Sequence, residues 1–405
     1  MKKIIFALLC AAVCLVSCNA NKGREPGYIV QVSIGDWHGC HYAPDDVIAR
    51  IEEVSRIIPI EKVMVGWCLD REPYRKIGEY LKKKGIQFIL YLPVYSEIED
   101  MFEARPAVDL WGNLPPEELM SQVSGFRFNC PTDPETYSGI TRIFEKNFED
   151  LGFDGVFLDR IRTQSFVGGV SGAFECGCPE CAQEYKKLGV DLNAVRDEYE
   201  RLGEKFFSVE GYTPENGFKF VSPVAESYFK AKGAVVSSEV CRLADYFRNR
   251  GLIVGFDLFA PVVAQFVGQD YRLLAAHCDF IKPMLYRITD APAGIGYEYD
   301  LVRKSVPGAE GYEPLVMNLE FLKGQLDAMK DLPCKIYPGI EINRSGDIVN
   351  STPEYLVESI GLLLQNDCDG AVLSWNIMQA PDENINALRS LSLTARKRHN
   401  LTKTE

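Results

Sequence analysis

The sequence has little histidine, a deficit of basic residues and no long apolar run. Only four of its 405 residues are histidines, which argues against a hydrolase centred on histidine and against a histidine-rich metal enzyme. No stretch reaches the ~18 consecutive apolar residues that a membrane-spanning helix needs. Lysine and arginine total 44 against 57 aspartates and glutamates, and the formal net charge is −13. Because a surface of this sign repels a phosphate backbone, we expect no nucleic-acid binding.

Several sequence motifs of common enzyme classes are also absent. The chain contains no P-loop, no glycine-rich fingerprint after its first strand-like run, no G-x-S-x-G elbow and no H-E-x-x-H pair. The overall composition is ordinary for a globular protein, with 46% hydrophobic and 25% charged residues. The length suits one large domain that carries insertions.

The first residues read as a leader. Lysines at positions 2 and 3 precede an apolar run over 4–16, which is too short to span a bilayer and is typical of a secretory signal. The run ends in Leu-Val-Ser-Cys18, which resembles a bacterial lipobox, and this resemblance implies a lipid on Cys18. We therefore predict a signal peptide over 1–17, a tether over 18–27, and a location in the bacterial cell envelope with a lipid anchor in the membrane. A plain signal peptide with a coincidental cysteine is the alternative.

Eight strand-like runs alternate with amphipathic stretches along the rest of the chain. The runs cover 28–37, 62–68, 86–95, 155–162, 252–259, 280–287, 335–343 and 370–378. Eight such units predict an α/β protein of the (β/α)8 TIM-barrel class over 28–396, followed by a tail over 397–405. Two connections are long enough to be insertions, one after strand 3 and one over 163–225 after strand 4. Both follow strand C-termini, where barrel enzymes build their active sites.

Carboxylates occupy the ends of three predicted strands. Period-2 alternation places Asp159 on the same face of strand 4 as Phe157, Glu341 at the end of strand 7, and Asp257 on the inner face of strand 5. Two carboxylates at a barrel mouth suit glycoside hydrolysis. We predict Asp159 as general acid, Glu341 as nucleophile and Asp257 as their support. The alternative is a structural layer of salt bridges to nearby arginines, one of which, Arg162, we otherwise assign to substrate binding.

Aromatic residues accompany these carboxylates. Five of them lie near strand ends and are predicted to bind substrate, because flat rings give the C–H faces of sugars a surface on which to stack. They are Trp37, Trp67, Tyr91, Tyr286 and Trp375. The alternative is that they form the upper layer of the core.

Short motifs resemble known carbohydrate enzymes. Asp154-Gly155 to Asp159, Met284-Leu285-Tyr286 and Trp375 resemble the glycoside hydrolase barrels, including the chitinase-like group. The acid of that group would fall at Ile161, so chitinase activity is not implied. The chain as a whole is most similar to glycoside-hydrolase-like lipoproteins of the Bacteroidetes type.

A second resemblance concerns a cysteine cluster. Cys176, Cys178 and Cys181, with Cys130 after strand 3, are similar to the zinc-binding cysteines of the family 42 β-galactosidases, although Asp159 stands where that family has glutamate. That resemblance places the nucleophile at Glu341. Four thiolates suit a closed structural zinc site, and a Cys130–Cys176 disulfide is the alternative. The remaining cysteines read as small buried hydrophobes. They are Cys40, Cys68, Cys241, Cys278, Cys334 and Cys368.

These observations predict a glycoside hydrolase that acts on an oligo- or polysaccharide. It would use no cofactor in catalysis, and any zinc would be structural. Two other classes remain open. One is a lipoprotein that binds a glycan without cleaving it. The other is a Schiff-base lyase, for which Lys282 on strand 6 is the candidate lysine.

Overall fold

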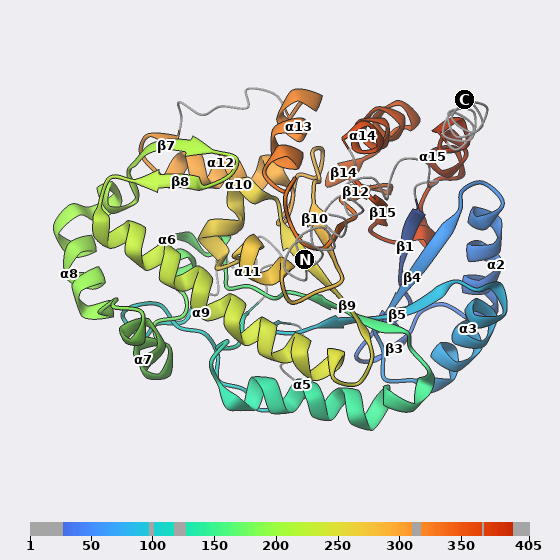
Figure 1. Cartoon of the computed structure of the whole chain (residues 1–405), viewed down its shortest axis with the longest axis horizontal. Coiled ribbons are helices and arrows are strands. Elements are labelled where there is room, and N and C mark those ends of the chain that lie inside the picture. Colours follow the sequence, from blue (N-terminus) through green and yellow to red (C-terminus); the bar gives the residue numbers. More distant parts are fainter. Residues whose placement is uncertain (1–26, 97–100, 117–126, 310–316, 367, 392–405) are drawn as a thin grey trace, which may run out of the picture.

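The chain folds into a closed parallel barrel in the computed structural model (Figure 1). The structure describes residues 27–96, 101–116, 127–309, 317–366 and 368–391. The sheet order is β11-β10-β12-β15-β1-β4-β5-β6-β9, and β9 pairs with β10 to close the ring. The barrel strands are β1 (Gly27–Ser33), β4 (Ile60–Gly66), β5 (Gln87–Pro93), β6 (Gly155–Asp159), β9 (Ile253–Phe259), β10 (Phe280–Met284), β11 (Lys335–Ile336), β12 (Gly339–Glu341) and β15 (Gly370–Ser374). The predicted TIM barrel is confirmed, and its seventh strand consists of the two short pieces β11 and β12.

Helices surround the barrel on its outer side (Figure 1). They are α2 (Pro44–Ser55), α3 (Arg71–Lys84), α5 (Pro134–Asn147), α9 (Pro223–Arg248), α10 (Pro261–Ala264), α11 (Tyr271–Ala275), α12 (Ile295–Ser305), α13 (Leu319–Asp327), α14 (Pro353–Gln365) and α15 (Asp382–Ala387). No helix of the described residues is long and apolar enough to cross a membrane.

Helix α3 illustrates how the sequence builds these elements. The side chain of Asp70 caps its first turn by accepting a hydrogen bond from the Glu72 amide, and Gly85 ends it with a φ of 69°. Tyr74, Ile77 and Leu81 recur at helical spacing and are fully buried. The helix therefore begins and ends where the capping residues stand, and its apolar face covers the sheet.

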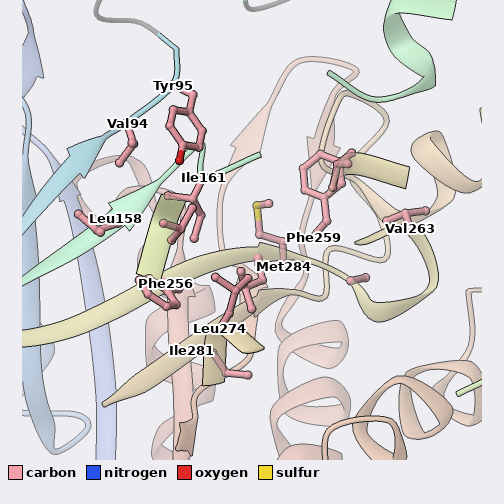
Figure 2. Close-up of a cluster of buried hydrophobic side chains, with 14 of the residues drawn as sticks. Val94, Tyr95, Leu158, Ile161, Phe256, Phe259, Val263, Leu274, Ile281 and Met284 are labelled. Atoms are coloured by element: carbon pink, nitrogen blue, oxygen red, sulfur yellow. The ribbon is translucent and has the colours of Figure 1, made fainter. Parts of the chain in front are cut away.

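Two hydrophobic clusters lie on the two faces of the barrel strands. The inner cluster fills the barrel with the residues Ile29, Met64, Ile89, Tyr91, Phe157, Phe280, Tyr337 and Val372. Alternate residues such as Leu158, Phe256 and Ile281 belong to the outer cluster (Figure 2). The period-2 alternation that places Asp159 on the inner face with Phe157 is thus borne out by the packing of β6.

The segment after β6 forms a lobe with its own aromatic core. It comprises η2 (Phe166–Gly168), α6 (Gly169–Ala173), α7 (Pro179–Lys187), α8 (Leu192–Leu202), η3 (Gly203–Phe207), β7 (Val209–Thr213) and β8 (Gly217–Phe220). Phe174 packs against Tyr199 and Phe207, with ring centroids 5.0 and 5.3 Å away, and against Tyr228 of α9. Figure 1 shows α7, α8 and the β7–β8 hairpin on the opposite side of the molecule from α2 and α3. Hydrophobic packing therefore fixes the lobe to the barrel's outer helix.

Several predictions fall outside the described residues. They are the signal peptide over 1–17, the lipid site Cys18 with nearly all of its tether, and the tail over 397–405.

Candidate active site

Asp159 ends strand β6 and carries the most accessible of the three predicted carboxylates. Its Oδ2 accepts a short hydrogen bond from the Tyr91 hydroxyl, and its Oδ1 accepts one from the Arg160 amide at 2.6 Å. The residue is 8% exposed, against 3% for Asp257 and 0% for Glu341. Of the three, Asp159 is therefore the best placed to touch a bound molecule.

Arg160 departs from the strand pattern directly after this carboxylate. Its φ of 55° places it in the left-handed region, which non-glycine residues adopt at a cost of about 1–3 kcal/mol and which is enriched at functional sites. Alternation predicts that Arg160 points away from Asp159. Instead, its Nε lies 3.7 Å from Asp159 Oδ2, because the left-handed residue ends the alternation.

Asp257 lies deeper inside the barrel and pairs with Lys282 of the neighbouring strand. Lys282 Nζ donates to Asp257 Oδ2 at 2.8 Å, while Oδ1 has no hydrogen-bond partner among the described residues. Burial raises the pKa of Asp257 to about 7; the Lys282 ammonium opposes this and the charge of Asp159 adds to it. The charge of Asp159 thus acts on Asp257, and the support role predicted for Asp257 stays a prediction.

Glu341 has a different environment. Its Oε1 accepts hydrogen bonds from the Ile288 amide at 2.9 Å and the Thr289 hydroxyl at 3.3 Å, and its Oε2 accepts one from the Tyr355 hydroxyl at 2.6 Å. Burial raises its pKa, and these hydrogen bonds oppose the rise. The side chain joins the loop after β10 to the start of α14, so both of its oxygens are already engaged.

Arg162 is buried between two aromatic rings. Its guanidinium carbon lies 4.6 Å from the ring centroid of Phe128 and 4.2 Å from that of Phe259. Burial lowers its pKa to about 10, and the carboxylate of Glu298 opposes this. With 6% exposure, this arginine fixes the loop after β6 in place, and its predicted role in substrate binding stays a prediction.

The predicted aromatic residues form two groups at the strand ends. Tyr91 stacks on Trp67 with centroids 5.0 Å apart, and Trp67 lies 6.4 Å from Trp37. On the other side of β1, Tyr286 meets Trp375 edge-on at 6.1 Å. The three tryptophans are half-buried, whereas the two tyrosines are buried. The first group is continuous with Asp159 through the Tyr91 hydroxyl.

Lys282 has the surroundings of a charged group. The Asp257 carboxylate raises the pKa of Lys282 above its usual range, although burial acts in the opposite direction. A Schiff-base lysine must lose its proton to attack a carbonyl, so this geometry disfavours the lyase alternative.

The four predicted cysteines come together as a buried cluster. The sulfur atoms of Cys130, Cys176, Cys178 and Cys181 all lie within 4.8 Å of one another. Cys130 Sγ is 3.4 Å from Cys178 Sγ and 3.5 Å from Cys181 Sγ. All four are free thiols, so the alternative Cys130–Cys176 disulfide does not form. Hydrogen bonds from the neighbouring thiols lower the pKa of Cys178, which favours the thiolate that binds metals.

One cysteine prediction is wrong. Cys40 and Cys68 form a disulfide, whereas the sequence suggested two small hydrophobes. The two residues are 28 positions apart, and their loops meet only because β1 and β4 are neighbours in the barrel. The signal that could have revealed the pair is that each cysteine belongs to the segment after one of two consecutive barrel strands, Cys40 after β1 and Cys68 after β4.

Comparison with known proteins supports the fold. No family model and no curated protein matches the chain. The PgaB (BpsB) glycoside hydrolase domain from Bordetella bronchiseptica is similar in structure, with a TM-score of 0.59 and 16% identity over 91% of this chain and 99% of that one. Alpha-L-fucosidase isoenzyme 2 from Paenibacillus thiaminolyticus has a TM-score of 0.52 and 10% identity over 93% of this chain and 50% of that one. A chitinase from Chromobacterium violaceum has a TM-score of 0.44 and 13% identity over 90% of this chain and 98% of that one.

Proposed function

We propose that the protein is a glycoside hydrolase that cleaves an oligo- or polysaccharide at the C-terminal end of its barrel. The observation that carries this proposal is the position of Asp159 at the end of β6, where it accepts a hydrogen bond from the Tyr91 hydroxyl while the Tyr91 ring stacks on Trp67. A carboxyl group beside flat rings can, in its protonated form, give its proton to a glycosidic oxygen while the rings support the sugar. Both of the barrels named above that have TM-scores above 0.5 are carbohydrate hydrolases, which favours this chemistry on this fold.

Asp159 is the proposed general acid and Asp257 its partner inside the barrel. Asp257 is too deeply buried to reach a glycosidic bond, so it acts through its charge and through Lys282, which holds it. Glu341 is fully buried, and Tyr355 and Thr289 hold its carboxylate in place, so a sugar cannot reach it without a rearrangement of these neighbours. The geometry therefore favours a positioning role for Glu341 over the nucleophile role that the sequence suggested.

Hydrolysis in water labelled with the oxygen-18 isotope tests this proposal. The purified protein is incubated with a panel of soluble polysaccharides, namely hydroxyethyl cellulose, glycol chitin, glycol chitosan and polygalacturonate, and the products are examined by mass spectrometry. A hydrolase transfers one labelled oxygen to each new reducing end. Products without the label would indicate a lyase. Binding without cleavage would support the alternative of a glycan-binding lipoprotein.

The cysteine cluster is proposed to hold a structural zinc ion. In a tetrahedral site with zinc–sulfur bonds of about 2.3 Å, the sulfur atoms lie about 3.8 Å apart, close to the 3.4 and 3.5 Å from Cys130 to Cys178 and Cys181. Cys130 lies in the loop after β5, whereas Cys178 caps the start of α7 and Cys181 lies in the first turn of that helix. Zinc would therefore tie the lobe to the neighbouring loop and take no part in the reaction.

The proposed location is the bacterial cell envelope, with the barrel tethered through lipid on Cys18. Only the lipobox-like sequence supports this proposal, since Cys18 lies outside the described residues. In the native host, Cys18→Ala should move the protein from the membrane fraction to the soluble fraction. Unchanged membrane association would refute lipidation.

A further inference from the structure

A disulfide joins the two loops that carry Trp37 and Trp67. Cys40 ends the hairpin formed by β2 (Gly35–Asp36) and β3 (Gly39–Cys40), which follows β1. Cys68 is the second residue after β4 and follows Trp67 directly. The covalent bond therefore connects neighbouring segments at the barrel mouth, each with one tryptophan.

Each loop is also fixed by hydrogen bonds. Asp36 accepts from the amides of His38 at 2.8 Å and Gly39 at 3.2 Å, which closes the hairpin turn around Trp37. In the second loop, the Cys68 amide donates to the Tyr74 hydroxyl at 2.9 Å. Both tryptophans thus occupy set positions before any ligand arrives.

The rings form a continuous run that ends at the proposed catalytic residue. From Trp37 the run passes to Trp67 at 6.4 Å, then to Tyr91 at 5.0 Å, and the Tyr91 hydroxyl bonds Asp159. These residues come from or follow β1, β4, β5 and β6, which are adjacent in the sheet. The run therefore follows the rim of the barrel beyond the space that one sugar at Asp159 would occupy.

We propose that Trp37 and Trp67, held together by the Cys40–Cys68 disulfide, form a preformed subsite for further sugar units of a polymeric glycan. The glycan extends from Asp159 across Trp67 towards Trp37. This inference rests on the proposed function and adds a direction and a polymeric substrate to it. Rings fixed in advance lose little conformational freedom on binding, so the disulfide increases affinity without entering the chemistry.

Affinity electrophoresis tests the subsite separately from cleavage. Native gels are cast with each of the four polysaccharides named above. The parent protein carries Asp159→Asn so that binding is measured without hydrolysis, and every further change is made in this parent. Trp37→Ala and the Cys40→Ser/Cys68→Ser double variant should each bind about tenfold more weakly than the parent. Two controls should bind like the parent. They are Trp111→Ala, which removes a tryptophan that is 37% exposed on the long loop after β5, and the Cys334→Ser/Cys368→Ser double variant.

The outcomes separate the two proposals. Parent-like retardation of Trp37→Ala, or a parent that none of the four polysaccharides retards, would overturn the subsite. If retardation depends on Trp37 but the wild type releases no reducing ends, the subsite stands and the hydrolase proposal fails. Circular dichroism and thermal unfolding of the cysteine variant show whether its loss of binding occurs in a folded barrel. If that variant unfolds, Trp37→Ala alone decides.

Discussion

Lys282 Nζ lies 2.8 Å from Asp257 Oδ2 inside the barrel, and the two side chains are 1% and 2% exposed. The residues face each other in the register of β10 and β9. Space for the lysine comes from Gly339 on the next strand, where a Cβ atom would approach Lys282 Cε to 2.6 Å. An ion pair thus replaces apolar packing in the barrel interior, next to the carboxylate of Asp159.

Removal of Lys282 should destabilise the protein strongly. Lys282→Met leaves the buried Asp257 carboxylate without its counter-charge, and we expect a loss of about 3–5 kcal/mol in the free energy of unfolding at pH 8 or above. Denaturant unfolding measures this loss. Because two apolar residues can replace a buried pair, Lys282→Met/Asp257→Leu should recover most of the stability. A single variant as stable as the wild type would mean that the pair contributes nothing.

The pH dependence of stability should carry the signature of Asp257. Burial raises its pKa from the ordinary 3.8 to about 7, so the folded state holds a proton that the unfolded state has already released. The contribution of this group therefore falls as pH rises from about 4 to 7. Thermal unfolding of the wild type, measured relative to Asp257→Asn across this window, should show the decline. A difference that grows with pH would contradict the assignment.

The cysteine cluster should contain zinc and depend on it. Purified protein should hold about one zinc ion per chain, and a strong chelator should lower its Tm. Cys178→Ser should lose the metal, whereas Cys241→Ser, which changes a buried cysteine outside the cluster, should retain it. Elemental analysis and thermal unfolding provide both readouts. Metal-free protein with the four thiols oxidised would refute the zinc proposal.

Substitution of Glu341 should distinguish a positioning residue from a nucleophile. Glu341→Gln keeps an acceptor for the Ile288 amide, so we expect kcat within about tenfold of the wild type. Glu341→Ala should lower the free energy of unfolding by about 1–3 kcal/mol, because it leaves buried donors without a partner. A loss of several orders of magnitude in Glu341→Gln, with azide restoring activity to Glu341→Gly, would instead establish the nucleophile role.

The sequence predicted the barrel well because its signals are local. Alternation identified the inner face of β6, and a resemblance to known zinc-binding cysteines identified the cluster that the structure brings together. The features that the sequence did not predict depend on contacts between distant segments. The pairing of Asp257 with Lys282 follows from the register of two strands, and that of Cys40 with Cys68 from two loops that meet at the mouth. The left-handed Arg160 also ends the alternation in a way that period 2 does not anticipate.

The kcat of Asp159→Asn, compared with that of Asp154→Asn, tests the central claim most directly. Both changes remove one carboxylate charge at an end of the same strand. Asp154, however, precedes β6, and its Oδ2 accepts a hydrogen bond from the Phe88 amide at 2.8 Å. On whichever polysaccharide the wild type cleaves, we expect kcat of Asp159→Asn to fall by about 10²–10⁴-fold, while Asp154→Asn stays within about threefold. Equal activity of a folded Asp159→Asn and the wild type would show that Asp159 is structural, and would contradict the proposed active site.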